Sequence, residues 1–475
     1  MTRKEEYKQY LKKHSDTWVK YRKRRAYYWD SITQYCNYFI HDDSRVLEIG
    51  CGSGEMLAGF KGREKTGIDF CQNLIEKARN NFPGIRFEVM EAENITLTEK
   101  YDVIILSNMI GVLEDIEHVF NELHKITHDK TRIIVTYYSR MWEPVIRLAE
   151  LIGIKRKIPS QNWLSTHDIS NLLYLAGFET YKHNRSMFIP FRIPLLSPFF
   201  NKFLSRLPFL NILSLNQFVF ARPCPPVQEK KIIDNRHSVS VIIPARNESG
   251  NIEEAIKRVP EMGKFTEIVF VEGNSTDDTW ETIQKMYEKY KDLRPMQIMQ
   301  QDGKGKGDAV RKGFAAAKGD ILMILDADLT VAPEDLPKFF NAATLGKGEF
   351  INGVRLVYPM EKNAMRPLNT LGNYFFSSLF SWLLEMPVKD TLCGTKVMFK
   401  SDYLKLAANR KFFGDFDPFG DFDLLFGAYK LNLKIIDLPI RYRERKYGDT
   451  NISRFRHGMI LLRMTLFAAG KIKFR

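Results

Sequence analysis

The sequence contains no cysteine framework and no long apolar run. Its five cysteines are Cys36, Cys51, Cys71, Cys224 and Cys393. They are odd in number and none forms a C-x-x-C pair, which is typical of reduced cytosolic thiols and not of a disulfide scaffold or zinc site. No stretch offers the roughly 20 uncharged apolar residues of a membrane-spanning helix, and residues 2–13 are too polar for a signal peptide. We therefore expect a cytoplasmic protein without a transmembrane helix.

The middle of the chain has no excess of either charge. The 475 residues carry a net charge of +14, of which residues 1–30 contribute +6 and residues 441–475 contribute +8. Two basic ends favour contact with anionic lipid head groups or phosphates. A solvated helix surface explains the N-terminal one equally well. No nucleic-acid-binding motif is present, so we expect no nucleic-acid partner. The length predicts two or three domains.

The most informative stretch is Gly319–Thr330. An apolar run, Ile321–Leu325, predicts a buried strand that ends in Asp326-Ala-Asp328. Alternate residues of a strand face the same way, so both carboxylates can enter one site. Two hard oxygen ligands without a thiol or imidazole suit Mg2+ or Mn2+ shared with a phosphate. The alternative is a solvated turn after a core strand.

Neighbouring motifs favour the metal-site interpretation. A β-branched strand from Val239 is stopped by Pro244, and a second strand, Glu267–Val271, is followed by the polar stretch 272–279. Residues 303–308, Gly-Lys-Gly-Lys-Gly-Asp, predict a flexible basic turn before another helix. In this order the motifs resemble a family-2 glycosyltransferase with the nucleotide-sugar-binding GT-A fold, and within it the dolichyl-phosphate mannosyltransferase group. The resemblance covers roughly Val239–Ile452.

The resemblance implies roles for individual residues. The residues that would shape the nucleotide pocket are Pro244, Ala245, Asn247 and Glu248. Glu272 would receive the base or ribose, Lys304 and Lys306 would touch phosphates, Asp326 would meet the ribose or metal, and Asp328 the metal and pyrophosphate. Two positions depart from the family pattern. Glu272-Gly-Asn stands where Asp-Asp-Gly is common, and Thr330 stands where the dolichyl-phosphate group has Gln, which leaves the base and the third metal ligand open.

The acceptor side is predicted from the last third of the chain. Residues 363–385 are apolar around most of the helix and fit either a membrane-interface helix beside a lipid acceptor or a helix buried on the sheet. By resemblance, Asp423 is the catalytic base or acceptor-positioning acid. Arg443, Arg445 and Lys446 resemble the loop that binds phosphates, a role that suits bidentate arginines. A basic edge strand is the alternative.

A second set of motifs lies in the N-terminal half. A strand from Val46 runs into Gly50-Cys-Gly52-Ser-Gly54, where glycines allow close backbone approach to a ligand and the next helix adds its N-terminal dipole. A second strand ends at Asp69, an acid that can accept both ribose hydroxyls. Further strands lead to Glu91-Ala-Glu93 and to Asn108.

This series resembles a class I S-adenosylmethionine-dependent methyltransferase over roughly residues 25–222. A dinucleotide-dependent dehydrogenase is the alternative for the glycine motif alone. The resemblance implies that Gly50, Gly52 and Gly54 border the cofactor's methionine and ribose. It also implies that Glu48 contacts the amino-acid end, Asp69 the ribose and Glu91 the adenine, with Asn108 near the sulfonium. For Glu91 a surface charge is the alternative.

The domain organisation follows from these motifs. We expect a basic arm at 1–24, a Rossmann-like methyltransferase domain at 25–222, a stiff linker at 223–238, a GT-A domain at 239–455 and a basic amphipathic tail at 456–475. The fold class is therefore α/β with two domains. The apolar segment 190–213 has two interpretations, a cover over the methyl-acceptor pocket, which its placement favours, or a membrane-interface segment.

Together these patterns predict a bifunctional enzyme. The C-terminal half would transfer a sugar from a nucleotide sugar to a polyprenyl phosphate with Mg2+ or Mn2+, peripherally bound to the cytoplasmic membrane face. The N-terminal half would use S-adenosylmethionine. One alternative is glycan extension on a saccharide acceptor, in which Asp423 serves as general base. Another is an inactive methyltransferase-like module that docks the transferase to a partner.

Overall fold

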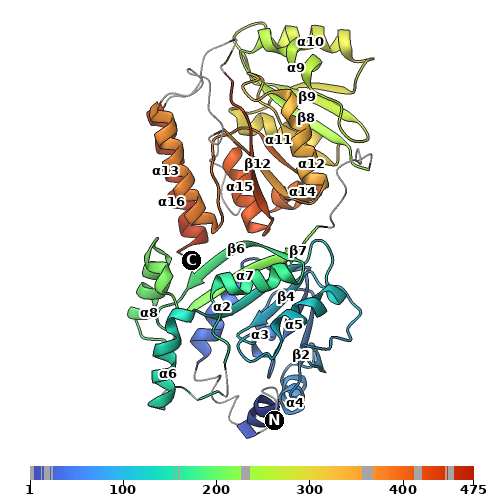
Figure 1. Cartoon of the computed structure of the whole chain (residues 1–475). Helices are drawn as coiled ribbons and strands as arrows, with labels where there is room; N and C mark the ends of the chain where they lie inside the picture. Colours follow the sequence, from blue (N-terminus) through green and yellow to red (C-terminus); the bar gives the residue numbers. More distant parts are fainter. Residues whose placement is uncertain are drawn as a thin grey trace. The chain divides into compact units, whose positions relative to one another are not determined.

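The computed structural model describes residues 5–11, 13–14, 22, 25–153, 155, 157–158, 161–225, 236–355, 367–410, 420–443, 445, 447 and 454–474. For 367–371, 421 and 454–457 it describes the backbone only. The chain divides into two compact units, Met1–Cys224 and Pro225–Lys473. Each unit is built on its own seven-stranded sheet with helices against it (Figure 1), which confirms the predicted α/β class with two domains.

The N-terminal unit holds a mixed sheet. Its strands are β1 (Arg45–Ile49), β2 (Glu64–Asp69), β3 (Arg86–Val89), β4 (Val103–Ser107), β5 (Arg132–Tyr138), β6 (Phe178–Ser186) and β7 (Asn216–Pro223). They are arranged in the order β3-β2-β1-β4-β5-β7-β6, and β7 runs antiparallel to both of its neighbours. Every residue of β4 is buried, as expected for a central strand covered on both faces.

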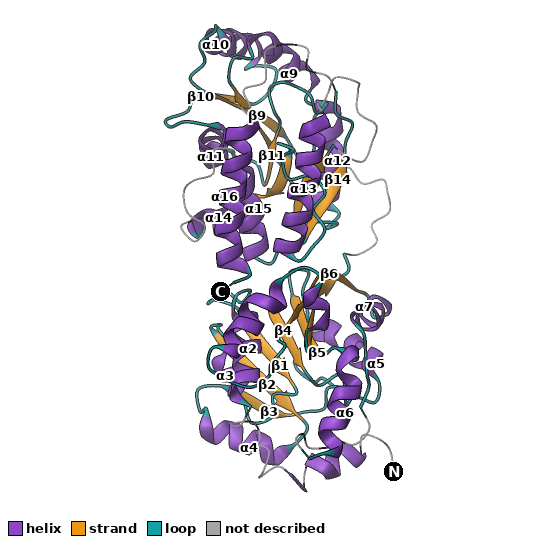
Figure 2. Ribbon diagram, turned by 90° about the vertical axis from the view of Figure 1, so that its left-hand side faces the viewer, coloured by secondary structure: helices purple, strands orange, loops and turns teal. Residues whose placement is uncertain are grey.

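Helices flank this sheet (Figure 2). They are α2 (Ala26–Asn37), α3 (Glu55–Gly59), α4 (Gln72–Asn81), α5 (Ile116–Glu122), α6 (Glu143–Leu151), α7 (Thr166–Leu175) and α8 (Leu196–Pro198). One of them, α7, begins with a Ser165–Asp168 capping box and is followed by Gly177 at φ 78°. Short irregular helical turns follow α8 up to Leu213.

The C-terminal unit has a second mixed sheet. Its strands are β8 (Val239–Ala245), β9 (Thr266–Glu272), β10 (Met296–Gln300), β11 (Ile321–Ile324), β12 (Phe350–Val354), β13 (Lys396–Phe399) and β14 (Ile435–Pro439). Their order is β10-β9-β8-β11-β13-β12-β14, with β13 antiparallel to β11 and β12. The β-branched and apolar runs that predicted β8, β9 and β11 are fully buried apart from Pro244.

Helices also cover the second sheet. They are α9 (Ile252–Arg258), α10 (Thr279–Tyr290), α11 (Lys306–Ala316), α12 (Leu336–Thr344), α13 (Pro367–Leu384), α14 (Lys400–Ala408), α15 (Asp421–Lys430) and α16 (Arg454–Ile472). The apolar helix predicted at 363–385 is α13. Its Phe380 stacks on Phe426 of α15, whereas Tyr374 and Phe375 are exposed. α16 packs against α13. No helix in the described part of the chain is both long enough and apolar enough to span a bilayer.

In both sheets the chain reverses its direction of winding between two central neighbours. These pairs are β1 and β4 in the first sheet, and β8 and β11 in the second. In open α/β sheets, ligands bind outside the carboxyl ends of the strands at such a switch point. The predicted site residues follow these strand ends, so the topology places each set at the edge where a ligand is expected.

Candidate active sites

A group of carboxylates and basic side chains lies at the carboxyl ends of β8 and β11. Arg445 donates from Nη2 to Asp328 Oδ2 at 2.6 Å and from Nη1 to Glu248 Oε1 at 3.0 Å. Lys306, from the first turn of α11, pairs with Asp326 Oδ1 at 2.6 Å. All five residues were predicted from sequence as separate candidates for the nucleotide, metal or phosphate. The structure brings them together.

Burial and charge act in opposite directions on these carboxyl groups. Burial raises the pKa of Glu248 to about 7, and nearby Asp328 and Asp326 add to this although Arg445 and Asn251 oppose it. Burial alone would also raise the pKa of Asp326, but the charge and hydrogen bond of Lys306 hold it below its ordinary value. The protonation of these carboxyl groups therefore depends on any cation or anion that binds beside them.

Asp328 is held from two sides. Its Oδ1 accepts from Thr330 Oγ1 at 2.8 Å and from the Thr330 amide at 3.1 Å, while Oδ2 faces Arg445. Thr330, the position that departs from the family pattern, thus orients the carboxylate. The Thr330 carbonyl in turn accepts the Arg443 amide at 2.9 Å, which joins the loop after β11 to the segment of Arg445.

The loops after β8 and β9 are bound to each other. The amide of Asn247 donates to Ser275 Oγ at 3.0 Å, and Asn247 Oδ1 accepts the Thr276 amide at 2.8 Å. Glu272, at the end of β9, accepts from the Ser275 amide at 2.5 Å and from Gln300 at 3.1 Å. Burial would raise its pKa, but these donors hold it below the ordinary value.

The basic glycine-rich turn leads into α11. Gly305 has φ 86° and ψ 160°, a conformation open only to glycine. Lys304 is exposed, whereas Lys306 points to Asp326. Arg443 is exposed, Tyr447 contacts Ser249 at 3.1 Å between hydroxyl oxygens, and Lys446 lies outside the described residues. Among the basic residues named from sequence, Lys306 and Arg445 are those whose contacts with the carboxylates are observed.

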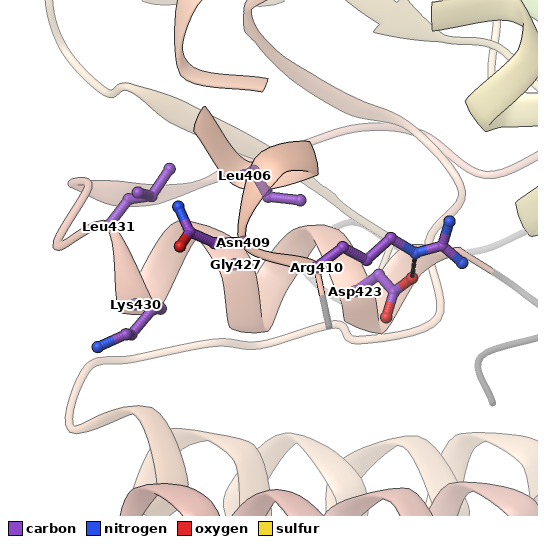
Figure 3. Close-up of a pocket in the computed structure, with 7 residues that line it drawn as sticks. All are labelled: Leu406, Asn409, Arg410, Asp423, Gly427, Lys430 and Leu431. Carbon is purple, nitrogen blue, oxygen red and sulfur yellow. Dashed lines mark hydrogen bonds and ion pairs between the residues drawn. The ribbon is translucent and has the colours of Figure 1, made fainter. Parts of the chain in front are cut away.

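Asp423 has different contacts (Figure 3). Its Oδ2 accepts from Arg410 Nε at 3.1 Å, the contact drawn in Figure 3. The same oxygen lies 3.8 Å from Arg311 Nη1. It lines a hollow of about 10 Å³ between α14 and α15, which is too small for a sugar. A carboxylate that faces two guanidinium groups has few lone pairs free for proton abstraction.

Two buried features behind the carboxylates were missed as site elements. Asp390 is fully buried and forms a bidentate pair with Arg355 at 2.7 and 2.9 Å, which fixes the turn before β13. In that turn Gly394 lies so close to Asp326 and Lys306 that a Cβ would collide with both side chains. The closeness of this turn to Asp326 depends on the pairing between β11 and β13.

In the N-terminal unit the glycine loop and Asp69 form a second site. Gly50, Gly52 and Gly54 all have positive φ angles, at 76°, 56° and 84°. The Gly52 amide donates to Asp69 Oδ2 at 2.9 Å, and the Cys71 amide donates to Oδ1 at 2.8 Å. A Cβ on Gly54 would collide with Phe87, so this glycine serves close packing of helix and strand.

Glu48 brings an incompletely bonded acid into this site. Its side chain is buried, and its Oε2 has no hydrogen-bond partner in the described structure. Burial raises its pKa to about 8, and only partial compensation comes from the charge of Arg22. Burial likewise raises the pKa of Asp69. A buried acid that lacks a partner on one oxygen is suited to receive a ligand's cationic group.

Asn108 begins a polar relay at the end of β4. It has φ 53°, and its Nδ2 donates to the Tyr28 hydroxyl at 2.8 Å. That hydroxyl donates to Asn216 Oδ1 at 2.9 Å, so the relay is held from α2 and β7. The Oδ1 of Asn108 is buried without a partner in the described structure.

These residues surround a cavity of about 150 Å³. Glu48, Gly50, Gly52, Asp69 and Asn108 line it. Glu91 is not among the lining residues found in the described chain. It pairs instead with Lys8 of the N-terminal arm, whereas Ala92 and Glu93 face the cavity. Lining residues that sequence reasoning missed are Tyr7, Leu11, Arg22, Trp29, Tyr138 and Lys155. They come from distant segments and carry no local motif.

Comparison with known proteins agrees with both sets of motifs. Residues 240–406 match the family model described as glycosyl transferase family 2. Residues 21–183 match a family model described as a methyltransferase domain. The chain joins a methyltransferase domain to a family-2 glycosyltransferase domain. Both resemblances noted in the sequence are thus confirmed, and so is the prediction of a transferase enzyme.

Several individual relatives are named as glycosyl or sugar transferases. A dolichol-phosphate mannosyltransferase of Pyrococcus furiosus is 40% identical over 23% of this chain and 30% of its own length. An undecaprenyl-phosphate 4-deoxy-4-formamido-L-arabinose transferase of Edwardsiella ictaluri is 35% identical over 23% of this chain and 34% of its own length. The low-salt glycan biosynthesis hexosyltransferase Agl6 of Haloferax volcanii is 27% identical over 49% of this chain and 54% of its own length. The chain thus spans about a third to a half of these relatives.

Among solved structures, a methyltransferase of Thermotoga maritima described as S-adenosylmethionine-dependent is 19% identical. The match covers 45% of this chain and 97% of that one, with a TM-score of 0.37.

Proposed function

We propose that the glycosyltransferase domain transfers a sugar from a nucleotide sugar to a polyprenyl phosphate. The observation that carries this proposal is the group formed by Asp326, Asp328, Glu248, Lys306 and Arg445 at the switch point of the sheet. Such a group suits a donor that presents ribose hydroxyls and a pyrophosphate. The named relatives that act on dolichol phosphate and undecaprenyl phosphate support the acceptor class.

In this proposal the chain's own residues bind and orient the donor. Glu272 and the linked loops of Asn247 and Ser275 form the nucleoside side of the pocket. Lys306 and Arg445 exchange their carboxylate partners for pyrophosphate oxygens, which stabilises the leaving group as negative charge develops on it. Lys304, Arg443 and Lys446 remain proposed phosphate contacts on the same basic segments.

A divalent cation fits this donor set. Asp326 and Asp328 provide hard oxygens, and neither imidazole nor thiolate competes beside them. In the described chain no group of three acidic, histidine or cysteine side chains is poised for a metal, so phosphate oxygens of the donor would complete the coordination. Mg2+ or Mn2+ would supply further charge neutralisation of the pyrophosphate.

The acceptor assignment also draws on Asp423. A sugar hydroxyl needs a general base, but the only base proposed from the sequence faces Arg410 and Arg311. A polyprenyl phosphate is ionised near neutral pH and needs no proton abstraction. The contacts of Asp423 therefore favour a positioning role and a phosphate acceptor over glycan extension on a saccharide.

The methyltransferase domain is proposed to bind S-adenosylmethionine in its cavity. The unpartnered oxygen of Glu48 suits the cofactor's amino group, and Asp69 suits the ribose hydroxyls. Glu93 lines the cavity, whereas Glu91, which was expected to meet the adenine, pairs with Lys8. Because the methyltransferase domain shares its chain with a glycosyltransferase domain, we propose the transferred sugar or its lipid-linked product as the methyl acceptor.

The proposal includes the organisation of the chain. It retains a methyltransferase domain at 25–222, a glycosyltransferase domain at 239–455, and peripheral attachment to the cytoplasmic face of a membrane where the lipid acceptor resides. Such an enzyme would act in the synthesis of a cell-envelope glycan.

Acceptor competition tests the proposal. Purified protein would receive a panel of nucleotide sugars, Mg2+ or Mn2+, and equal amounts of a short polyprenyl phosphate and candidate saccharides. We expect the lipid alone to become glycosylated. Glycosylated saccharide without lipid product would replace this proposal with glycan extension. Calorimetric titration with S-adenosylmethionine is the second arm, and absence of binding would favour the inactive docking module.

A further inference from the structure

The segment 187–215 between β6 and β7, here called the insertion, exposes many apolar side chains. Its exposed large residues are Phe191, Ile193, Leu195, Leu196, Phe199, Phe203, Phe209, Ile212 and Leu213. The insertion has no acidic residue, and its charged residues are Arg192, Lys202 and Arg206. Isolated exposed apolar residues are ordinary, but a contiguous basic-flanked group marks an interaction surface.

The insertion is polar on the inside and apolar on the outside. Ser197, Asn201 and Ser205 recur at four-residue spacing, and all three are buried. Phe199 and Phe203, on the outer side of the same helical turns, are exposed. A helix that faces water has the opposite distribution. The medium expected outside this segment is therefore apolar.

The buried polar residues are fully engaged. Asn201 accepts the amides of Phe188 at 2.7 Å and Ile189 at 2.9 Å, and its Nδ2 donates to the Ile189 carbonyl at 2.7 Å and to the Tyr27 hydroxyl at 3.1 Å. Ser197 donates to the Phe191 carbonyl at 2.5 Å, and Ser205 to that of Asn201 at 2.6 Å. The bond to Tyr27 anchors the insertion to α2, and the bonds within the insertion keep its polar side chains inward and its apolar side outward.

Two strained turns project the most exposed side chains. In each, a proline carbonyl accepts the amide two residues later, at 2.7 Å from Leu196 to Pro194 and 2.8 Å from Leu210 to Pro208. The central residues are Leu195 and Phe209, with φ 63° and 67°. Positive φ is costly for bulky residues, and such conformations cluster at functional surfaces. Leu195 is 88% and Phe209 92% exposed.

The apolar surface extends to α6. Trp142, just before this helix, donates from its indole to the Leu213 carbonyl at 2.8 Å. Val145, Leu148 and Leu151 of α6 are exposed. None of the residues that line the cofactor cavity in the described chain comes from the insertion. The interpretation of the segment as a cover over the methyl-acceptor pocket therefore finds no support in the cavity's lining.

We propose that the insertion docks the methyltransferase domain on an anionic lipid surface, with Leu195 and Phe209 entering the acyl boundary. The absence of acidic residues and the exposed Arg192 and Lys202 match anionic head groups, and the outward apolar side matches the layer beneath them. The inference deepens the proposed membrane location by naming a surface on the methyltransferase domain, and it does not depend on which acceptor is glycosylated.

A site-specific fluorophore tests insertion in the full chain. Cys224 is exposed and the other four cysteines are buried, so Cys224→Ser provides a background for labelling. In that background Phe209→Cys would carry an environment-sensitive nitrobenzoxadiazole label, and Leu175→Cys, exposed on α7, would carry the control label. Vesicles of phosphatidylcholine with phosphatidylglycerol should raise and blue-shift fluorescence at position 209 but not at 175. Equal responses, or none at 209, would overturn the proposal.

Vesicle flotation measures how much Leu195 and Phe209 contribute to membrane binding. The double variant Leu195→Ser/Phe209→Ser should lower the partition coefficient about 100-fold, since each side chain loses its transfer from water. Leu175→Ser and Leu293→Ser, exposed apolar residues outside the insertion, should leave it unchanged. Retained S-adenosylmethionine binding and far-ultraviolet circular dichroism would establish that the double variant folds. An unchanged partition coefficient in the double variant would refute lipid docking. A label response that rises with protein concentration in the absence of vesicles would also refute it, and would indicate that the insertion contacts a second copy of the chain.

Discussion

Arg445 and Asp328 are 117 positions apart in the chain, and their side chains meet at 2.6 Å. The same guanidinium also holds Glu248, so one arginine joins the loop after β8 to the loop after β11. A cation shared between two acids is well placed to respond to an incoming pyrophosphate, which offers it oxygens of higher charge. This relationship underlies the proposed donor site.

Arg445→Ala should lower kcat/KM for the nucleotide sugar by about 100- to 1000-fold, because a donor to the developing pyrophosphate charge is lost. Arg445→Lys should recover part of this, since the charge remains but the two-pronged geometry does not. Steady-state kinetics with the preferred donor would measure both. Arg258→Ala is the matched control, because Arg258 pairs with Glu334 at the surface. Equal rates in Arg445→Ala and Arg258→Ala would remove Arg445 from the donor site.

Gly394→Ala should reduce activity without a comparable loss of stability. The added methyl group would collide with the ends of the Asp326 and Lys306 side chains. Relief of this collision would displace both side chains from the donor site. We expect kcat/KM to fall about tenfold or more, with a small change in Tm. Gly470→Ala, whose Cβ would meet open space, is the control. A large fall in Tm with normal activity would show that Gly394 serves folding only.

Asp423→Asn separates the two acceptor classes. With a polyprenyl phosphate acceptor no proton is abstracted, so kcat should change by less than about tenfold, while Asp328→Ala should abolish most activity. Rates for both variants would be measured with the same lipid acceptor. Tm would be measured as well, because the substitution removes an anionic partner of Arg410 and Arg311. A loss of several orders of magnitude in Asp423→Asn alone would restore its role as general base.

S-adenosylmethionine affinity should depend on the ionisation of Glu48. The pKa of this carboxyl is raised to about 8, so the unliganded protein binds a proton there at neutral pH. A cationic amino group favours the ionised form, and binding must then release the proton. The Kd should therefore rise as pH falls below about 8, by up to about tenfold per unit. Calorimetry across pH would measure this. Glu48→Gln should bind more weakly and lose most of the pH dependence, and an unchanged slope in that variant would exclude Glu48.

The same shift has a consequence for folding. Because the pKa of Glu48 in the folded state lies above the ordinary value of 4.5, the folded state keeps this proton up to a higher pH than the unfolded state does. This contribution to the free energy of unfolding is present below about pH 4.5 and is lost as pH rises toward 8. A bound cofactor should oppose the loss.

Much of both sites could be predicted because their residues stand at strand ends in the sequence. In the donor site Asp326 and Asp328 come directly after a buried run, and in the methyltransferase site Gly50 follows β1 and Asp69 ends β2. Sequence could not show that Arg445 meets Asp328, that Lys8 meets Glu91, or that Gly394 backs Asp326. These contacts depend on strand order and on long-range packing. The apolar composition of 190–213 was evident, but its inverted burial became clear only from the direction in which Ser197, Asn201 and Ser205 point.

The most direct measurement is the mass of the lipid product formed from a polyprenyl phosphate and a panel of nucleotide sugars with Mg2+ or Mn2+. The proposed function predicts one sugar added to the lipid phosphate by the parent protein and none by Asp328→Ala. Addition of S-adenosylmethionine should then add a methyl group to that product if the two domains act in sequence. A parent protein that leaves the lipid phosphate unmodified with every donor, while glycosylating a saccharide, would contradict the central claim.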